Sequence, residues 1–186
     1  MTVLAAFWLP ILLSAVFVFI VSSIIHMTPL WHKSDFPAMP NQERVSVALR
    51  ALAIPPGDYY LPRPKDMKEM RTPEFKEKFK AGPVVFMTVL AKPSMSMTRP
   101  LTLWFIFVLV TNFLVAYVAS RTLAPGADRE MVFCLVGTVT FLAHAAALWP
   151  MSIWYGRALS ITIKSTIDAL IFAAVTAGTF VWLWPR

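Results

Sequence analysis

Four long apolar stretches, separated by polar segments, dominate the pattern of the chain. They cover roughly residues 3–25, 101–119, 131–149 and 161–184. At about 1.5 Å of rise per residue, each stretch is long enough as a helix to cross a hydrocarbon layer of about 30 Å. The pattern therefore predicts an all-α membrane protein with four transmembrane helices. The first stretch exceeds the length of a signal-peptide core and lacks a basic start, so it is expected to be a retained helix.

Turn chemistry connects the second and third stretches. Pro100 suits the first turn of a helix. The segment LAPGADRE supplies a tight turn, and Asp128 can cap the helix that follows it. The two stretches are therefore predicted to form a helical hairpin.

A single proline-rich insertion, residues 26–100, separates the first and second stretches. Its pattern predicts short amphipathic helices, one starting after Asn41 as a cap and another starting at Thr72 with Pro73 in its first turn. The segment IPPGDYYLPRP between them is expected to be extended or turning. The segment PVVFMTVLA is too short to span a membrane, so it is placed at the membrane interface or against the helices.

Composition and charge agree with a membrane location. Hydrophobic residues make up 58% of the chain and charged residues 15%, against about 25% charged residues in soluble domains. The net charge of +7 is explained by basic loops beside anionic lipid, so no nucleic-acid partner is predicted. The single cysteine, Cys134, excludes an intrachain disulfide.

The distribution of basic residues predicts the orientation. Residues 26–100 hold 12 Lys or Arg, and Arg157 and Lys164 lie on the same side, whereas only 3 basic residues lie on the other side. The positive-inside rule then places both termini outside and the insertion in the cytoplasm or at the interface.

Two charged residues interrupt the fourth stretch. Lys164 and Asp168 each face a penalty of roughly 2.5 to 3.5 kcal/mol inside hydrocarbon, so they are expected to be paired, shallow or functional. Asp168 is expected to pair with Lys164 one turn earlier. Because Lys before Asp is the less favourable order on a helix, His144 across the helix interface is a further expected partner. His144 on the third stretch reaches a similar depth. The sequence thus predicts a structural polar cluster of His144, Lys164 and Asp168, with a proton or solute path as the alternative.

Small residues on the third and fourth stretches predict a tight helix pair. The residues that carry this prediction are Gly137, Ala173, Ala174, Ala177 and Gly178.

No cofactor is predicted, although two candidate sets were weighed. His26 and His144 are the histidines in or beside the spans and could hold haem b, but the chain has no CxxCH motif. Met95 and Met97 form a Met-x-Met pair of the kind that binds copper, with interfacial packing as the other interpretation. P-loop, GxGxxG, HExxH and GxSxG motifs are absent from the sequence, so no enzyme activity is predicted.

Several phrases, namely ALRALAIPPGDYYLPRP, FKAGPV, LAPGAD and STIDALIFAAVTAGTFVWLWP, resemble those of small bacterial inner-membrane proteins of unassigned function. The resemblance implies a bacterial inner membrane and no activity. The predicted role is a non-catalytic accessory subunit of a larger membrane complex, in contact with lipid and with other transmembrane subunits or further copies. The alternatives are a small transporter or proton-coupled protein that uses the His/Lys/Asp cluster, and a haem or copper redox subunit.

Overall fold

The computed structural model describes residues 6–28, 31–91 and 95–186 and divides the chain into two compact units. The helical unit comprises Met1–Pro37 and Ser96–Arg186, and the insertion unit comprises Ala38–Met95. The insertion is therefore shorter at both ends than the predicted 26–100. As a consequence, the segment that directly follows the first long helix belongs to the helical unit.

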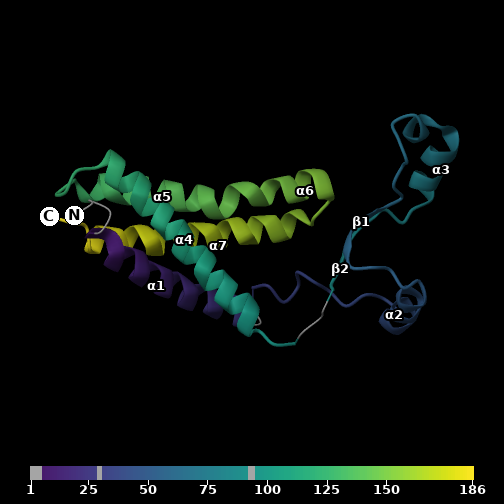
Figure 1. The fold of residues 1–186 in the computed structure, drawn as a ribbon, viewed down its shortest axis with the longest axis horizontal. Helices are drawn as coiled ribbons and strands as arrows, with labels where there is room; N and C mark the ends of the chain where they lie inside the picture. Colours follow the sequence, from purple (N-terminus) through teal and green to yellow (C-terminus); the bar gives the residue numbers. More distant parts are fainter. Residues whose placement is uncertain (1–5, 29–30, 92–94) are drawn as a thin grey trace. The chain divides into compact units, whose positions relative to one another are not determined.

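Among the described residues, four helices are long and apolar enough to cross a membrane, as the pattern predicts (Figure 1). They are α1 (Trp8–Met27), α4 (Thr98–Thr122), the run Arg129–Tyr155 and α7 (Leu159–Trp182). The third run is composed of α5 (Arg129–Ala145), a 3-10 turn η3 (Ala146–Leu148) and α6 (Trp149–Tyr155).

Prolines stand in the first turns of two of these helical segments. The third run continues past residue 149 because Pro150 falls in the first turn of α6, where its missing N–H is not needed. Since α1 begins at Trp8, Pro10 also lies in a first turn, where it disturbs no interior hydrogen bond.

The helices pack through two apolar layers. α5 and α7 form the most extensive pair, and α1 packs against both α4 and α7. One layer, called here the apolar end, consists of Phe7, Ile11, Val115, Ala116, Ala119, Val132, Val136, Ala177 and Phe180. A second layer consists of Ala15, Val18, Val108 and Phe172. The core of the helical unit is thus built from aliphatic and aromatic side chains of all four long helices.

The insertion unit contains short helices, as predicted, and also a two-stranded sheet. Its elements are α2 (Gln42–Ala51), β1 (Gly57–Leu61), the 3-10 turn η2 (Glu69–Arg71), α3 (Pro73–Ala81) and β2 (Val85–Val89). The strands pair antiparallel, with Tyr60 opposite Phe86 and their rings stacked at 4.5 Å. The all-α prediction is therefore wrong for this unit, because aromatic residues in both segments and β-branched residues in β2 favour paired strands.

The predicted helix caps have different outcomes. The Thr72 hydroxyl accepts a hydrogen bond from the Phe75 N–H, and Asp128 caps α5 through the Glu130 N–H, so both predicted caps are confirmed. α2 does start directly after Asn41, but this residue adopts a left-handed conformation and its side chain makes no cap hydrogen bond.

The insertion unit has almost no core. Phe75 is the only buried residue among its described positions, 38–91 and 95. Most of the apolar side chains in this unit are exposed instead. This contrasts with the helical unit, whose two layers are fully packed.

Candidate functional site

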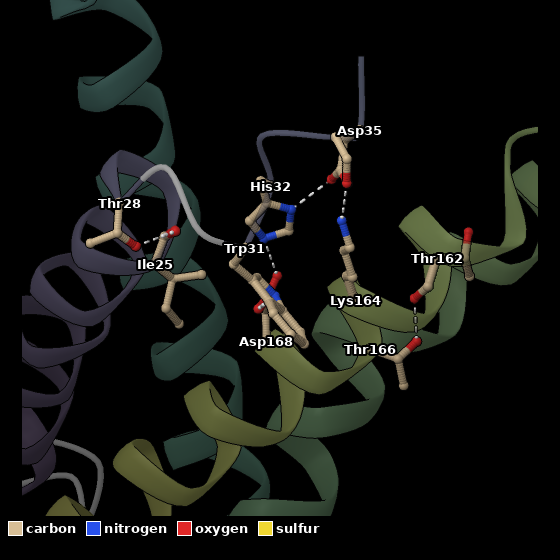
Figure 2. A network of polar contacts seen from close by, with 10 residues as sticks. Ile25, Thr28, Trp31, His32, Asp35, Thr162, Lys164, Thr166 and Asp168 are labelled. Carbon is tan, nitrogen blue, oxygen red and sulfur yellow. Dashed lines mark hydrogen bonds and ion pairs between the residues drawn. The ribbon is translucent and has the colours of Figure 1, made fainter. Parts of the chain in front are cut away.

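The most buried charged group of the helical unit is the Asp168 carboxylate on α7, which is 4% exposed. The Trp31 indole Nε1–H donates to its Oδ1 at 3.0 Å, and the His32 Nε2 lies 3.0 Å from its Oδ2 (Figure 2). Both partners come from the segment that follows α1. That segment therefore folds over α7 and covers the carboxylate.

Lys164, one turn earlier on α7, extends the same set of contacts. Its Nζ donates to Asp35 Oδ1 at 2.7 Å and to Ser34 Oγ at 3.0 Å. The other oxygen of Asp35, Oδ2, lies 2.6 Å from His32 Nδ1. Figure 2 shows His32 between the two carboxylates, with Lys164 pointing toward Asp35. We call Trp31, His32, Asp35, Lys164 and Asp168 the ionic cluster.

Neighbouring groups of the ionic cluster affect the pKa of the Asp35 carboxyl. Burial alone would raise the pKa of the Asp35 carboxyl, but hydrogen bonds from Lys164 and His32 outweigh this effect and hold the pKa below its ordinary value. Asp35 is therefore ionised at neutral pH. Counted as formal charges, the two carboxylates of the cluster outnumber its one ammonium group.

The His32 imidazole meets a carboxylate at each ring nitrogen. A neutral imidazole has one N–H, so it can donate to only one of these carboxylates. Its other nitrogen then presents a lone pair toward a carboxylate oxygen. That lone pair and the carboxylate oxygen beside it could both coordinate a cation.

A second histidine lies beside the ionic cluster. The His26 ring, in the last turn of α1, has its centroid 4.5 Å from that of His32. One potential ligand atom from each of His26, His32 and Asp168 lies within 4.8 Å of the others. These three residues form the one group of potential metal ligands found among the described positions.

The predicted polar cluster is only partly correct. Lys164 and Asp168 do lie together, but each is held by residues of the segment after α1 and no ion pair joins them in the described part of the chain. His144 does not take part. Its ring packs against Trp104, Phe107 and Phe172, with centroids 5.5 to 6.0 Å apart. From the rise per residue along the helices, His144 is expected at a depth similar to that of Asp168. Its side chain, however, faces aromatic residues instead of Asp168.

The small residues divide between two faces of α7. Ala173 and Ala177 are buried, and a Cβ added to Gly137 on α5 would lie 3.6 Å from the Ala177 Cβ. Ala174 and Gly178 are exposed. Only the first pair therefore contributes to the contact between α5 and α7.

The two candidate haem ligands do not contact each other among the described residues, and the two candidate copper ligands are exposed. His26 lies beside His32 and makes no contact with His144 within the described residues. Met95 is fully exposed at the end of the insertion unit, and Met97 is exposed just before α4.

Uncharged polar groups occupy the interior between the apolar layers. Asn112 Nδ2 donates to Ser14 Oγ at 2.8 Å, and the Ser14 hydroxyl donates to the Pro10 carbonyl at 2.6 Å. Asn112 Oδ1, Thr140 Oγ1 and Thr176 Oγ1 are buried without a hydrogen-bond partner among the described residues. His144 Nε2 is the remaining buried polar atom without a partner in the described part of the chain.

Sequence reasoning did not predict Trp31, His32 and Asp35 as partners of Lys164 and Asp168. A signal was present, since Asp35 is the first acidic residue of the chain and follows His32 by three positions. Two charges in the fourth stretch needed opposite partners. These partners come from a loop, and a loop has no periodic pattern that shows which of its side chains face the helices.

No protein family, curated protein or solved structure matches this chain. The fold and the site define a protein of four long apolar helices, with a charged cluster closed by a loop at one end.

Proposed function

We propose that the protein is a multi-pass protein of the bacterial inner membrane that acts, without catalysis, as an accessory subunit of a larger membrane complex. The length of the four helices supports the membrane assignment. So does their outer surface, which exposes large apolar side chains along every helix. Examples on α4 are Leu103, Val110, Phe113 and Leu114. Such surfaces suit lipid or partner helices.

The orientation follows from charge. The insertion unit and its flanks carry most of the basic residues of the chain, and cytoplasmic loops are enriched in Lys and Arg. The proposal therefore puts the insertion on the cytoplasmic side and both termini outside.

The accessory role depends on one observation: the insertion unit lacks a core of its own. With Phe75 as the only buried residue among its described positions, the unit buries too little apolar surface to be stable alone. Leu52 and Leu90 are 68% and 67% exposed. A unit of this kind gains stability when another surface covers its apolar side chains.

A partner subunit and the lipid surface make different demands on the insertion. A partner that packs on the unit needs the exposed apolar residues, whereas anionic lipid also needs the basic ones. The proposal selects the partner, because Leu52 lies at the end of α2 and Leu90 follows β2, so apolar exposure is not confined to one amphipathic helix.

The test is native electrophoresis of mild detergent extracts from bacterial membranes. The wild-type chain should migrate in a complex well above its own mass of 20.9 kDa. The double variant Leu52→Gln/Leu90→Gln should leave that complex yet remain in the membrane fraction.

The matched control is Lys76→Gln/Lys80→Gln, which removes charge from α3 and leaves the apolar side chains intact. It should keep the complex. Migration of the wild-type chain as a stable monomer would contradict the accessory role, and loss of the complex in the lysine variant alone would favour lipid binding.

A second function has one observation in its favour. The ionic cluster holds a titratable imidazole between carboxylates, and Asn112, Thr140 and Thr176 offer polar atoms deeper in the same helices. These features would suit a small transporter or proton-coupled protein. Four helices leave little room for alternating access unless several copies assemble. Solute or proton flux in reconstituted vesicles that Asp168→Asn abolishes would favour this function instead.

A further inference from the structure

We propose that His26, His32 and Asp168 bind a divalent transition cation, with Zn²⁺ as the best match. The three residues come from α1, from the segment after it and from α7, so distant parts of the sequence converge on one point. Two imidazoles and one carboxylate form a ligand set that proteins use for zinc, with water as the fourth ligand. The inference is independent of the accessory role.

The geometry is close to that of a metal site. Zinc ligands lie about 2.0 to 2.2 Å from the ion, so neighbouring ligand atoms in a tetrahedron are about 3.3 to 3.6 Å apart. His32 Nε2 and Asp168 Oδ2 are 3.0 Å apart, so this edge opens by only a few tenths of an ångström. His26 closes the remaining gap, since the three ligand atoms already lie within 4.8 Å of one another.

His26 has the freedom to make that movement. Its side chain is exposed in the last turn of α1 and has no hydrogen bond among the described residues. A ring rotation therefore breaks no hydrogen bond among these residues, although it changes the ring contact with His32.

The surrounding residues already orient the ligands. His32 places Nδ1 2.6 Å from Asp35, and an N–H at this nitrogen leaves the Nε2 lone pair directed at the site. Trp31 donates to the second oxygen of Asp168, which leaves Oδ2 toward the site. Histidine ligands in metal sites commonly have such a carboxylate behind them. Lys164 in turn holds Asp35 in place.

Formal charge also favours a cation at this point. The ionic cluster has two carboxylates and one ammonium group, and His32 Nε2 and Asp168 Oδ2 approach each other at the proposed site.

The experiment uses the full-length chain, purified in detergent, freed of metal with a chelator and carrying Cys134→Ser to remove the single thiol. Zn²⁺ is titrated in competition with a chromophoric chelator at neutral pH. We expect one Zn²⁺ per chain, and Co²⁺ should give the visible absorption of a tetrahedral site. His26→Ala should weaken Zn²⁺ binding by at least about tenfold.

His144→Phe is the matched control, because it removes the third histidine of the chain and keeps an aromatic ring among Trp104, Phe107 and Phe172. It should bind Zn²⁺ as the parent does. Absence of stoichiometric binding in the parent would overturn the proposal. Equal weakening in His26→Ala and His144→Phe would also overturn it. Because His26 is exposed, circular dichroism should show His26→Ala to be folded.

Discussion

The two ends of the helical unit are closed in different ways. At the apolar end, the Phe7 ring stacks on Phe180 at 6.3 Å and meets the edge of Trp184 at 5.0 Å. At the other end, the ionic cluster joins the segment after α1 to α7 through hydrogen bonds of 2.7 to 3.0 Å. Ring packing therefore holds the helices together at the apolar end, and hydrogen bonds between charged groups do so at the other end.

The difference matters because the proposed surroundings are lipid. Apolar side chains gain little by leaving lipid for a protein core, so the apolar end is stabilised by packing alone. A charge that is buried without its partner has a large cost, so the ionic cluster favours one arrangement of its loop over all others. We therefore expect the ionic end to be more sensitive to substitution.

The largest effect is expected for Asp168→Ala. This change leaves the Trp31 N–H without its acceptor and His32 Nε2 without its partner, and loss of one partner of a buried pair costs about 3 to 5 kcal/mol. The free energy of unfolding, measured in detergent with a chelator present, should fall by that amount.

Ser160→Ala, at an exposed position on the same helix, is the control and should change stability by less than about 0.5 kcal/mol. Wild-type stability in Asp168→Ala would mean that the ionic cluster does not hold the loop.

A smaller effect is expected for Phe180→Ala at the apolar end. Phe180 is fully buried, and in a soluble core the same change costs about 3 to 5 kcal/mol. Because lipid removes most of the transfer term, the loss of unfolding free energy should be below about 3 kcal/mol. Leu170→Ala, at an exposed position of α7, provides the control. A loss as large as that of Asp168→Ala would remove the distinction between the two ends.

Much of the helical unit could be predicted because its signal is local. Runs of apolar residues predicted four helices, and Thr72 and Asp128 carried their caps in the sequence itself. The strands β1 and β2 were missed, since their pairing joins Gly57–Leu61 to Val85–Val89 across intervening helices. Short apolar segments between prolines do not show which distant segment they pair with.

Only the two residues of the ionic cluster that lie on α7 could be predicted from the sequence. Lys164 and Asp168 stood out because charges are costly in an apolar helix. Their true partners, Asp35 and His32, lie in a polar loop where charge is ordinary. Helix geometry suggested His144 from depth alone, and depth does not determine which way a side chain faces.

The smallest expected effect separates charge from simple hydrogen bonding within the ionic end. A double-mutant cycle with Lys164→Met and Asp35→Asn should give a coupling energy of about 1 kcal/mol or more, because both side chains are largely buried and lie 2.7 Å apart.

The neutral pair of Ser152 and Thr162 is the comparison, with hydroxyl oxygens 2.6 Å apart. Neutral hydrogen bonds between membrane helices average about 0.6 kcal/mol, so its alanine cycle should give the lower value. Equal coupling energies for the two pairs would mean that the charges of Lys164 and Asp35 add no stability beyond that of a neutral hydrogen bond. The ionic end would then differ from the apolar end only in having hydrogen bonds.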